Sequence, residues 1–126
     1  MTVAKLALSA IGMVLAVSSI AAAPAANVAN GKALFGRCAA CHTADKGGAN
    51  GLGPNLYGIV GRKAGSKKDF SYSAAMRNSG IVWSNQKLDG YIAHPADVVP
   101  GNRMAFAGLP EAKQRADLLA WLSTLK

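Results

Sequence analysis

Apolar residues are concentrated in one long run near the start of the chain. Residues 6–20 are mostly apolar, Lys5 stands immediately before them, and three alanines follow at 21–23. A positive charge, an apolar run and small residues in that order are typical of a secretory signal peptide. An uncleaved membrane anchor is the alternative, because the run nearly reaches the roughly 20 residues that span a bilayer.

The alanine-rich end of this segment favours cleavage. Pro24 directly follows Ala23, so we expect cleavage near Ala23 to Ala26 rather than at one fixed bond. The chain is thereby divided into a signal peptide at 1–25 and one mature domain at 26–126. No later segment has an apolar run long enough to cross a membrane.

Capping residues and helical spacing predict about four helices in the mature domain. Asn27 or Asn30 can cap a first helix that runs through 32–35 into a pair of cysteines. Ser73 can cap a short helix that extends to about Asn78. No convincing alternation of apolar and polar residues predicts a strand, so the expected class is all-α with long loops.

Two further helices are expected in the second half of the chain. Ser84 can cap a helix over 85–94, which Pro95 should end because the residue before a proline avoids the helical conformation. Pro110 is expected in the first turn of the last helix, where its missing N–H costs nothing. The apolar stripe of that helix consists of Leu118, Leu122 and Leu125.

Between these helices, residues 43–54 predict a glycine-rich loop, and further glycines follow at 58, 61 and 65. The mature chain of about 100 residues is short for a self-sufficient core, and a buried flat cofactor would supply the missing apolar mass. The whole chain has a formal charge of +8, or +7 without Lys5. A basic surface suits acidic protein patches, anionic lipid or nucleic acid, although nucleic acid does not suit an exported protein and the charge also serves solubility.

One short motif carries the chemistry: Cys38, Ala39, Ala40, Cys41 and His42. Such a Cys-x-x-Cys-His sequence is typical of covalent attachment of haem c. Cysteines three apart on a helical turn share one face, so two thiols can reach the two vinyl groups of one porphyrin. His42 can then bind the iron.

A Cys-x-x-Cys pair also occurs in thioredoxin-like redox sites, zinc sites and structural disulfides. Zinc needs about four ligands, but the chain has two cysteines and two histidines, and His94 is far away in the sequence. A thioredoxin-like pair belongs between a strand and a helix, a pattern that the sequence lacks. Haem is therefore the favoured interpretation.

Further short motifs follow the cysteine motif in order, and each is weak alone. They are Gly53-Pro54-Asn55-Leu56-x-Gly58, Gly61-Arg62-Lys63-x-Gly65, Phe70-x-Tyr72-Ser73, Gly80-Ile81-x-Trp83, Tyr91, Pro95 and Pro100-Gly101-x-Arg103-Met104-x-Phe106. As an ordered set, over about residues 28–125, they resemble the class I cytochromes c, close to the mitochondrial and bacterial c2-type proteins. The resemblance implies the cytochrome c fold, about four helices with long loops wrapped around one covalently bound haem.

The resemblance also implies that His42 and Met104 are the two axial ligands of the iron. A methionine thioether favours reduced iron and raises its potential. With both positions filled, the iron has no place for oxygen or a substrate. Met76 and His94 are the rival ligands, and core packing is the ordinary role of a methionine.

Supporting roles follow from the same resemblance. The carbonyl of Pro54 would accept a hydrogen bond from the His42 ring, and the hydroxyl of Tyr91 would reach the sulfur of Met104. A haem propionate would be bound by Arg62, Tyr72 and Trp83. Core packing is the alternative role for Tyr91 and Trp83, and an ordinary surface charge is the alternative for Arg62.

The sequence thus predicts an exported monohaem c-type cytochrome, a monomeric one-electron carrier between membrane or periplasmic redox enzymes, located in the periplasm. Docking would use the exposed haem edge near Arg103 and Phe106. The basic residues expected near this edge are Arg37 and Arg103, with Lys32 and Lys113 as further candidates. Several lysines of the usual docking ring are replaced, by Ala96, Asp97, Pro110 and Glu111. The alternatives are a peroxidase-like haem enzyme with an open iron site, and a haem electron-entry or sensor module anchored by residues 1–26.

Overall fold

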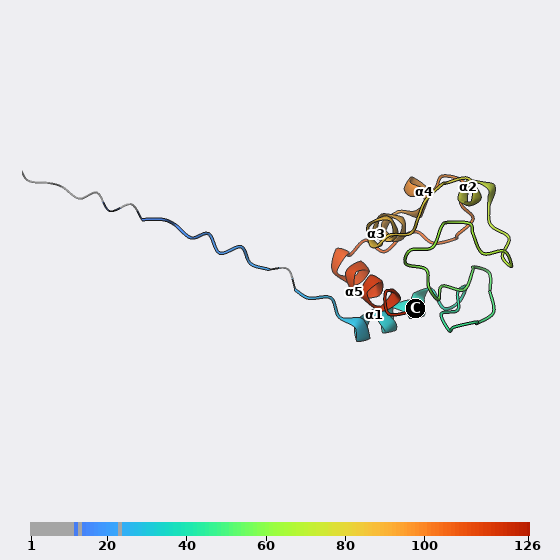
Figure 1. Cartoon of the computed structure of the whole chain (residues 1–126), viewed down its shortest axis with the longest axis horizontal. Coiled ribbons are helices and arrows are strands. Elements are labelled where there is room, and N and C mark those ends of the chain that lie inside the picture. The colour runs from blue at the N-terminus through green and yellow to red at the C-terminus, as the bar shows by residue number, and fades with distance from the viewer. Residues whose placement is uncertain (1–11, 13, 23) are drawn as a thin grey trace, which may run out of the picture.

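The computed structural model describes residue 12, residues 14–22 and residues 24–126, and the folded part begins at residue 28. The predicted signal peptide lies partly outside the described residues. Those of its residues that are described form no helix and lead as an extended trace to the folded part (Figure 1). Among the described residues, no helix combines the length and the apolar character needed to cross a bilayer.

The described residues form helices joined by long loops, which confirms the predicted all-α class. The elements are α1 (Val28–Leu34), the 3₁₀-helix η1 (Phe35–Arg37), α2 (Ala74–Arg77), α3 (Asn85–Ala93), α4 (Pro95–Val98) and α5 (Ala112–Leu122). The β pairing in this part of the chain is one isolated bridge between Lys63 and Val82. A long loop region between η1 and α2 forms one side of the molecule (Figure 1).

Three of the predicted capping residues begin helices as expected. The side chains of Asn27, Ser73 and Ser84 accept hydrogen bonds from main-chain N–H groups in the first turns of α1, α2 and α3. Each cap satisfies an N–H that has no partner within the helix. Local sequence therefore fixes where these three helices start.

Other predicted boundaries were wrong. The first helix does not continue as an α-helix into the cysteines, because α1 ends at Leu34 and η1 tightens the chain before Cys38. Pro95 ends α3 but also starts α4, so the described part of the chain has five α-helices rather than about four. Pro110 lies before the last helix, which begins at Ala112 with Glu111 as its N-cap.

α1 and α5 pack closely against each other, although they are the first and the last helix in the sequence (Figure 1). Gly31 is buried at the contact, where a Cβ atom would clash with the main-chain oxygen of Asp117 and lie 2.9 Å from Cβ of Trp121. The rings of Phe35 and Trp121 also pack here, with centroids 4.9 Å apart. A residue larger than glycine would force the helices apart.

A buried carboxylate adds polar contacts to the same helix pair. Asp117 is 2% exposed and accepts hydrogen bonds from the N–H of Asn27, the amide of Asn30 and the ammonium of Lys113. Asp117 was not part of the apolar stripe predicted for the last helix. The apolar core joins α3 and α5 to the loops, with Leu118, Leu119 and Leu122 as its α5 members. Leu125 lies beyond the helix and is half-buried.

Candidate haem site

The two cysteines lie on one hydrogen-bonded turn that follows η1. The N–H groups of Cys41 and His42 both donate to the carbonyl of Cys38, at 3.0 and 2.9 Å. Residues three apart on such a turn face the same side. Both cysteine side chains are half-buried, so they are placed to reach one molecule together.

The acidity of Cys38 differs from that of a redox-active thiol. Burial, with the neighbouring Cys41 as a smaller cause, raises the pKa of the Cys38 thiol. Reactive Cys-x-x-Cys pairs depend on a lowered pKa, because the thiolate is the nucleophile. The raised pKa of Cys38 does not favour a thioredoxin-like role for this turn.

His42 is oriented by the loop that follows it. Its Nδ1 lies 2.7 Å from the carbonyl oxygen of Pro54. A neutral imidazole that donates from Nδ1 leaves the lone pair of Nε2 for a metal. Gly53 permits this approach, because a Cβ there would lie 2.7 Å from Nδ1 of His42. Glycine is thus required next to Pro54.

The sequence interpretation gave no separate role to Asn55, which holds this loop together. Asn55 is 4% exposed. Its amide donates to the hydroxyl of Thr43 at 2.8 Å and to the carbonyl of Asp45 at 2.9 Å. A buried amide with these partners fixes the segment after His42 against the segment after Pro54. The sequence signal for it is its place in the motif Gly53-Pro54-Asn55-Leu56-x-Gly58, which by itself shows none of these partners.

The loop that carries Met104 is held by two polar contacts. The N–H of Met104 donates to the side-chain oxygen of Asn102 at 2.9 Å. The hydroxyl of Tyr91 lies 3.9 Å from the Met104 sulfur, as a weak O–H to S hydrogen bond. Burial raises the pKa of Tyr91 to about 12, so its hydroxyl stays protonated and able to donate at neutral pH.

The three predicted propionate ligands are brought only partly together. Trp83 is buried, and its ring centroid lies 4.8 Å from that of Tyr91. The main-chain N–H of Trp83 donates to the main-chain carbonyl of Arg62. The guanidinium of Arg62 donates to the carbonyls of Asn55, at 2.9 Å, and of residue 57.

Tyr72 lies on a different segment of the chain from Arg62 and Trp83. It is half-buried, and its ring meets that of Phe70 edge-on, with centroids 4.9 Å apart. Arg62 has N–H groups beyond those that bond main-chain carbonyls, and these remain available to a carboxylate. A shared propionate site for the three residues therefore stays a prediction.

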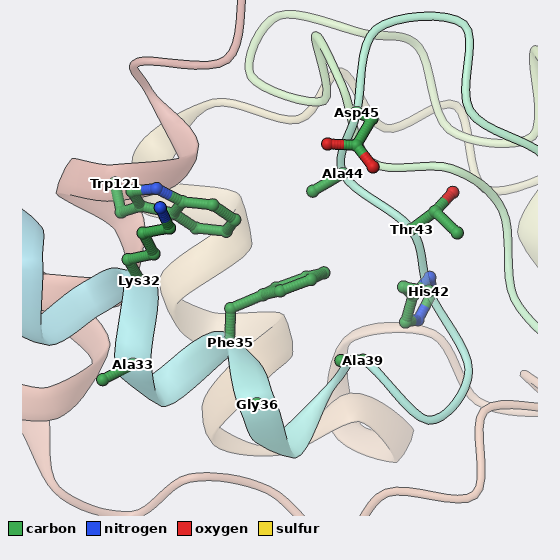
Figure 2. A pocket seen from close by; sticks show the side chains of 10 residues that line it. All are labelled: Lys32, Ala33, Phe35, Gly36, Ala39, His42, Thr43, Ala44, Asp45 and Trp121. Carbon is green, nitrogen blue, oxygen red and sulfur yellow. The ribbon is translucent and has the colours of Figure 1, made fainter.

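A hollow of about 440 Å³ connects the histidine to the helix pair. Figure 2 shows Phe35 and His42 pointing into it, with Trp121 of α5 on the far side. Thr43 and Asp45 line it from the loop. The cysteine turn thus lies directly beside the packed α1–α5 contact, which gives it a rigid support.

Comparison with known proteins identifies this arrangement. The family model "Cytochrome c" matches residues 28–126. The chain belongs to the cytochrome c family. It carries one covalently attached haem c, for which Cys38 and Cys41 provide the attachment motif.

Individual relatives agree with the family assignment. Cytochrome c of Trypanosoma brucei brucei is 54% identical over 83 residues, which cover 66% of this chain and 89% of that protein. Cytochrome c2 of Rhodopila globiformis is 47% identical over 105 residues, 82% of this chain and 98% of that protein. The structure of cytochrome cH from Methylobacterium extorquens superposes with a TM-score of 0.73 at 38% identity, covering 78% of this chain and 98% of that one.

The residues of this cytochrome c family member fit the haem. Two thiols share one turn, the adjacent imidazole has one nitrogen directed to a carbonyl and the other left for iron, and a thioether lies on a separately held loop. These donors match those of His/Met c-type cytochromes. Family membership also makes monohaem electron transfer the general function of the chain.

Proposed function

We propose that the chain is an exported one-electron carrier in which His42 and Met104 would hold the haem iron. The observation that carries this proposal is the fixed ring of His42, whose Nδ1 lies 2.7 Å from the Pro54 carbonyl. That contact sets the tautomer and makes the free nitrogen a stronger ligand. The haem supplies reversible one-electron chemistry at iron.

The protein side of this function is to hold both ligands and keep other molecules away. Met104 would close the second axial position, and the Tyr91 hydroxyl would restrain its sulfur. A thioether in that position favours reduced iron and raises the potential. Arg62, Tyr72 and Trp83 would provide donors for a propionate, since a carboxylate in a shielded position needs them.

The cellular setting is proposed from the first part of the chain. Residues 1–25 would direct export and be removed, with cleavage near Ala23 to Ala26, which places a monomeric carrier in the periplasm. Its partners would be membrane or periplasmic redox enzymes. A small transient interface suits such exchange.

Carbon monoxide distinguishes the carrier from the enzyme alternative. The reduced native protein should show a low-spin visible spectrum and bind carbon monoxide poorly, because no axial position is open. Ready binding at neutral pH would support an enzyme with an open iron site and contradict Met104 ligation. Hydrogen peroxide turnover, measured on the same sample, should be correspondingly low.

The anchored alternative needs a separate measurement. Mass spectrometry of the protein purified from its native cells should give an N-terminus between residues 24 and 27. An intact N-terminus, together with recovery in the membrane fraction, would instead support an electron-entry or sensor module held by residues 1–26.

A further inference from the structure

Asp117 of α5 reaches the main chain at the residue that caps α1. Its Oδ1 accepts a hydrogen bond from the main-chain N–H of Asn27 at 2.7 Å, and its Oδ2 accepts one from the side-chain amide of Asn30 at 2.7 Å. Asp117 is 2% exposed, whereas Asn27 is an exposed residue. The main-chain nitrogen at which the chain enters α1 therefore lies between a buried carboxylate and the solvent.

The charges around Asp117 leave this carboxylate only partly balanced. Its ion pair is with Lys113, one turn earlier in α5, whose side chain is 49% exposed. The other charged side chains of α1 and α5 have different neighbours: Lys32 lines the hollow beside the cysteine turn, and Arg115 pairs with Asp89 of α3. Because water screens a half-exposed lysine, a second positive charge close to Asp117 would be favourable.

Removal of the proposed signal peptide would create such a charge. A main-chain amide carries no net charge, whereas the α-amino group at a chain end is mostly protonated at neutral pH, since its ordinary pKa is about 7.7–8.0. Cleavage after Ala26 would leave the ammonium on the nitrogen of Asn27, which already lies 2.7 Å from Oδ1 of Asp117. Cleavage after Ala25 would leave it on Ala26, one residue or about 3.5 Å upstream, where a carboxylate still favours the charged form.

The pair would not carry the full cost of burying two charges. An ion pair with both partners buried loses the hydration of both. Residues 24–27 are exposed, so the ammonium would keep water on its outer side. The carboxylate of Asp117 is buried by the packing of the helices before any amine is present. The new charge therefore adds attraction without burying a further group.

We propose that Asp117 is the binding site for the new amino terminus that signal-peptide removal creates at Ala26 or Asn27. Processing would thereby strengthen the contact between α1 and α5, and the processed chain would be more stable than its precursor. The inference rests on the proposed export and cleavage, but it concerns a property of the chain that is separate from electron transfer.

The test is the pKa of the α-amino group in the processed, haem-loaded protein. Cyanate carbamylates the free amine but not the ammonium, so its rate between about pH 6 and 10 gives this pKa. Mass spectrometry identifies the N-terminal residue and follows the carbamylated N-terminal peptide apart from the lysines. We expect the pKa to be raised by about one unit, which corresponds to a tenfold preference for the paired ammonium.

Two carboxylate variants show whether Asp117 is the cause. Asp117→Asn should return the pKa of the α-amino group to its ordinary range. Asp97→Asn is the matched control, because it removes a carboxylate of equal charge from an exposed position in α4, and it should leave the pKa raised. An ordinary pKa in the parent protein, or equal lowering by both variants, would overturn the proposal.

A second measurement needs no variant that must fold. Carbamylation removes the charge of the α-amine, so it should lower the melting temperature of the processed protein at pH 7 and low ionic strength. A group whose pKa is raised by folding stabilises the protein fully below its unfolded pKa, here about 8, and the effect is lost as the pH rises through the folded value. The difference between the modified and unmodified proteins should therefore disappear by about pH 10. Equal melting temperatures at pH 7 would contradict the proposal.

The same samples separate this inference from the proposed export. A mature chain that begins upstream of Ala26 would overturn the inference and leave export standing, because its amine lies too far from Asp117. Processing at Ala26 or Asn27 followed by an ordinary pKa would do the same. An intact signal peptide would contradict export and cleavage, and with them the source of the amine.

Discussion

At the scale of single residues, polar contacts decide which atoms of the proposed ligands are available to iron. The Pro54 carbonyl engages Nδ1 of His42. The side chain of Asn102 holds the main chain of Met104, and the Tyr91 hydroxyl approaches its sulfur. Each ligand therefore has a partner that fixes its orientation.

Replacing Met104 by alanine should open the iron and lower its reduction potential. The thioether stabilises reduced iron, so its loss favours the oxidised state. Potentiometric titration and carbon monoxide difference spectra measure the two effects. Met76→Ala is the matched control, since it removes another half-buried methionine and should leave both properties nearly unchanged. An unchanged potential in Met104→Ala would refute the ligand assignment.

Tyr91→Phe should lower the potential by a smaller amount while Met104 stays bound. The hydroxyl draws electron density from the sulfur, so removing it makes the sulfur a better donor to oxidised iron. Because burial raises the pKa of Tyr91 to about 12, the difference between the two proteins should persist from neutral pH to about pH 10. A potential equal to that of the parent protein would indicate that Tyr91 only fills the core.

At the scale of elements, the contact between α1 and α5 supports the haem-binding turn. Gly31 allows the two helices to approach, and Phe35 packs on Trp121 beside the hollow that His42 lines. Disturbing this contact should therefore affect folding more than it affects the iron ligands.

Gly31→Ala should destabilise the folded protein by about 1–3 kcal/mol, the usual cost of overpacking a close contact. The added Cβ would meet the main chain of Asp117. Denaturant unfolding of the haem-loaded protein measures the loss. Gly36→Ala is the control, because a Cβ there has no heavy atom within 4 Å. If both variants were equally stable, the close approach of the helices would not matter energetically.

Asp117→Asn should reduce stability at neutral pH and flatten its dependence on acid. Hydrogen bonds from the main-chain N–H of Asn27 and from the side chains of Lys113 and Asn30 lower the pKa of Asp117. It falls from its ordinary 3.8 to about 2. As the pH falls, the unfolded chain binds the proton at Asp117 before the folded protein does. The contribution of the ionised Asp117 to the free energy of unfolding is therefore full above about pH 4 and disappears as the pH falls to about 2.

Thermal unfolding between pH 2 and 7 tests the Asp117 prediction, with the exposed Asp97→Asn as a control of equal charge. The parent protein and Asp97→Asn should lose melting temperature in parallel between about pH 4 and 2. A parallel loss in Asp117→Asn would assign the acid sensitivity to other carboxylates.

Local signals predicted some of these elements, and long-range contacts determined the rest. The caps at Asn27, Ser73 and Ser84 were readable because they act within one helical turn. The start of α4 at Pro95 was missed because proline suits a first helical turn as well as a helix end. Asp117 and Asn55 could not be predicted, since their partners are brought close only by the fold.

The candidate site likewise has residues that local sequence predicted and contacts that only the fold determined. The order of Cys38, Cys41 and His42 predicted the haem, because its spacing is local and chemically specific. The partners of Arg62 were not readable from spacing, and its side chain donates to main-chain carbonyls of the neighbouring loop. Sequence thus named the reactive groups, whereas the fold determined what else they contact.

At the scale of the whole molecule, positive charge dominates encounters with other molecules. The sequence carries 14 basic and 6 acidic residues, which give a formal charge of +8. Haem propionates would offset part of it. Charge of one sign increases association rates with oppositely charged partners, and salt screens it over a Debye length of about 8 Å at physiological ionic strength.

The rate of electron exchange with small charged reagents should depend on this positive charge. The rate with an anionic iron–cyanide complex should fall as ionic strength rises, whereas the rate with a cationic complex should rise. Arg103→Gln should weaken the salt dependence more than Lys87→Gln, because Arg103 precedes Met104. Stopped-flow measurements decide this, and equal slopes for the two variants would argue against docking near the Met104 loop.

The pairing of α1 with α5 also has a consequence for the order of events during synthesis. A ribosome makes α1 and the cysteine turn long before it makes α5, which supplies their packing surface. Until that last helix is complete, the two thiols lack their structural support and stay accessible. Attachment of sulfur to porphyrin is therefore compatible with a chain whose first and last helices have not yet packed together.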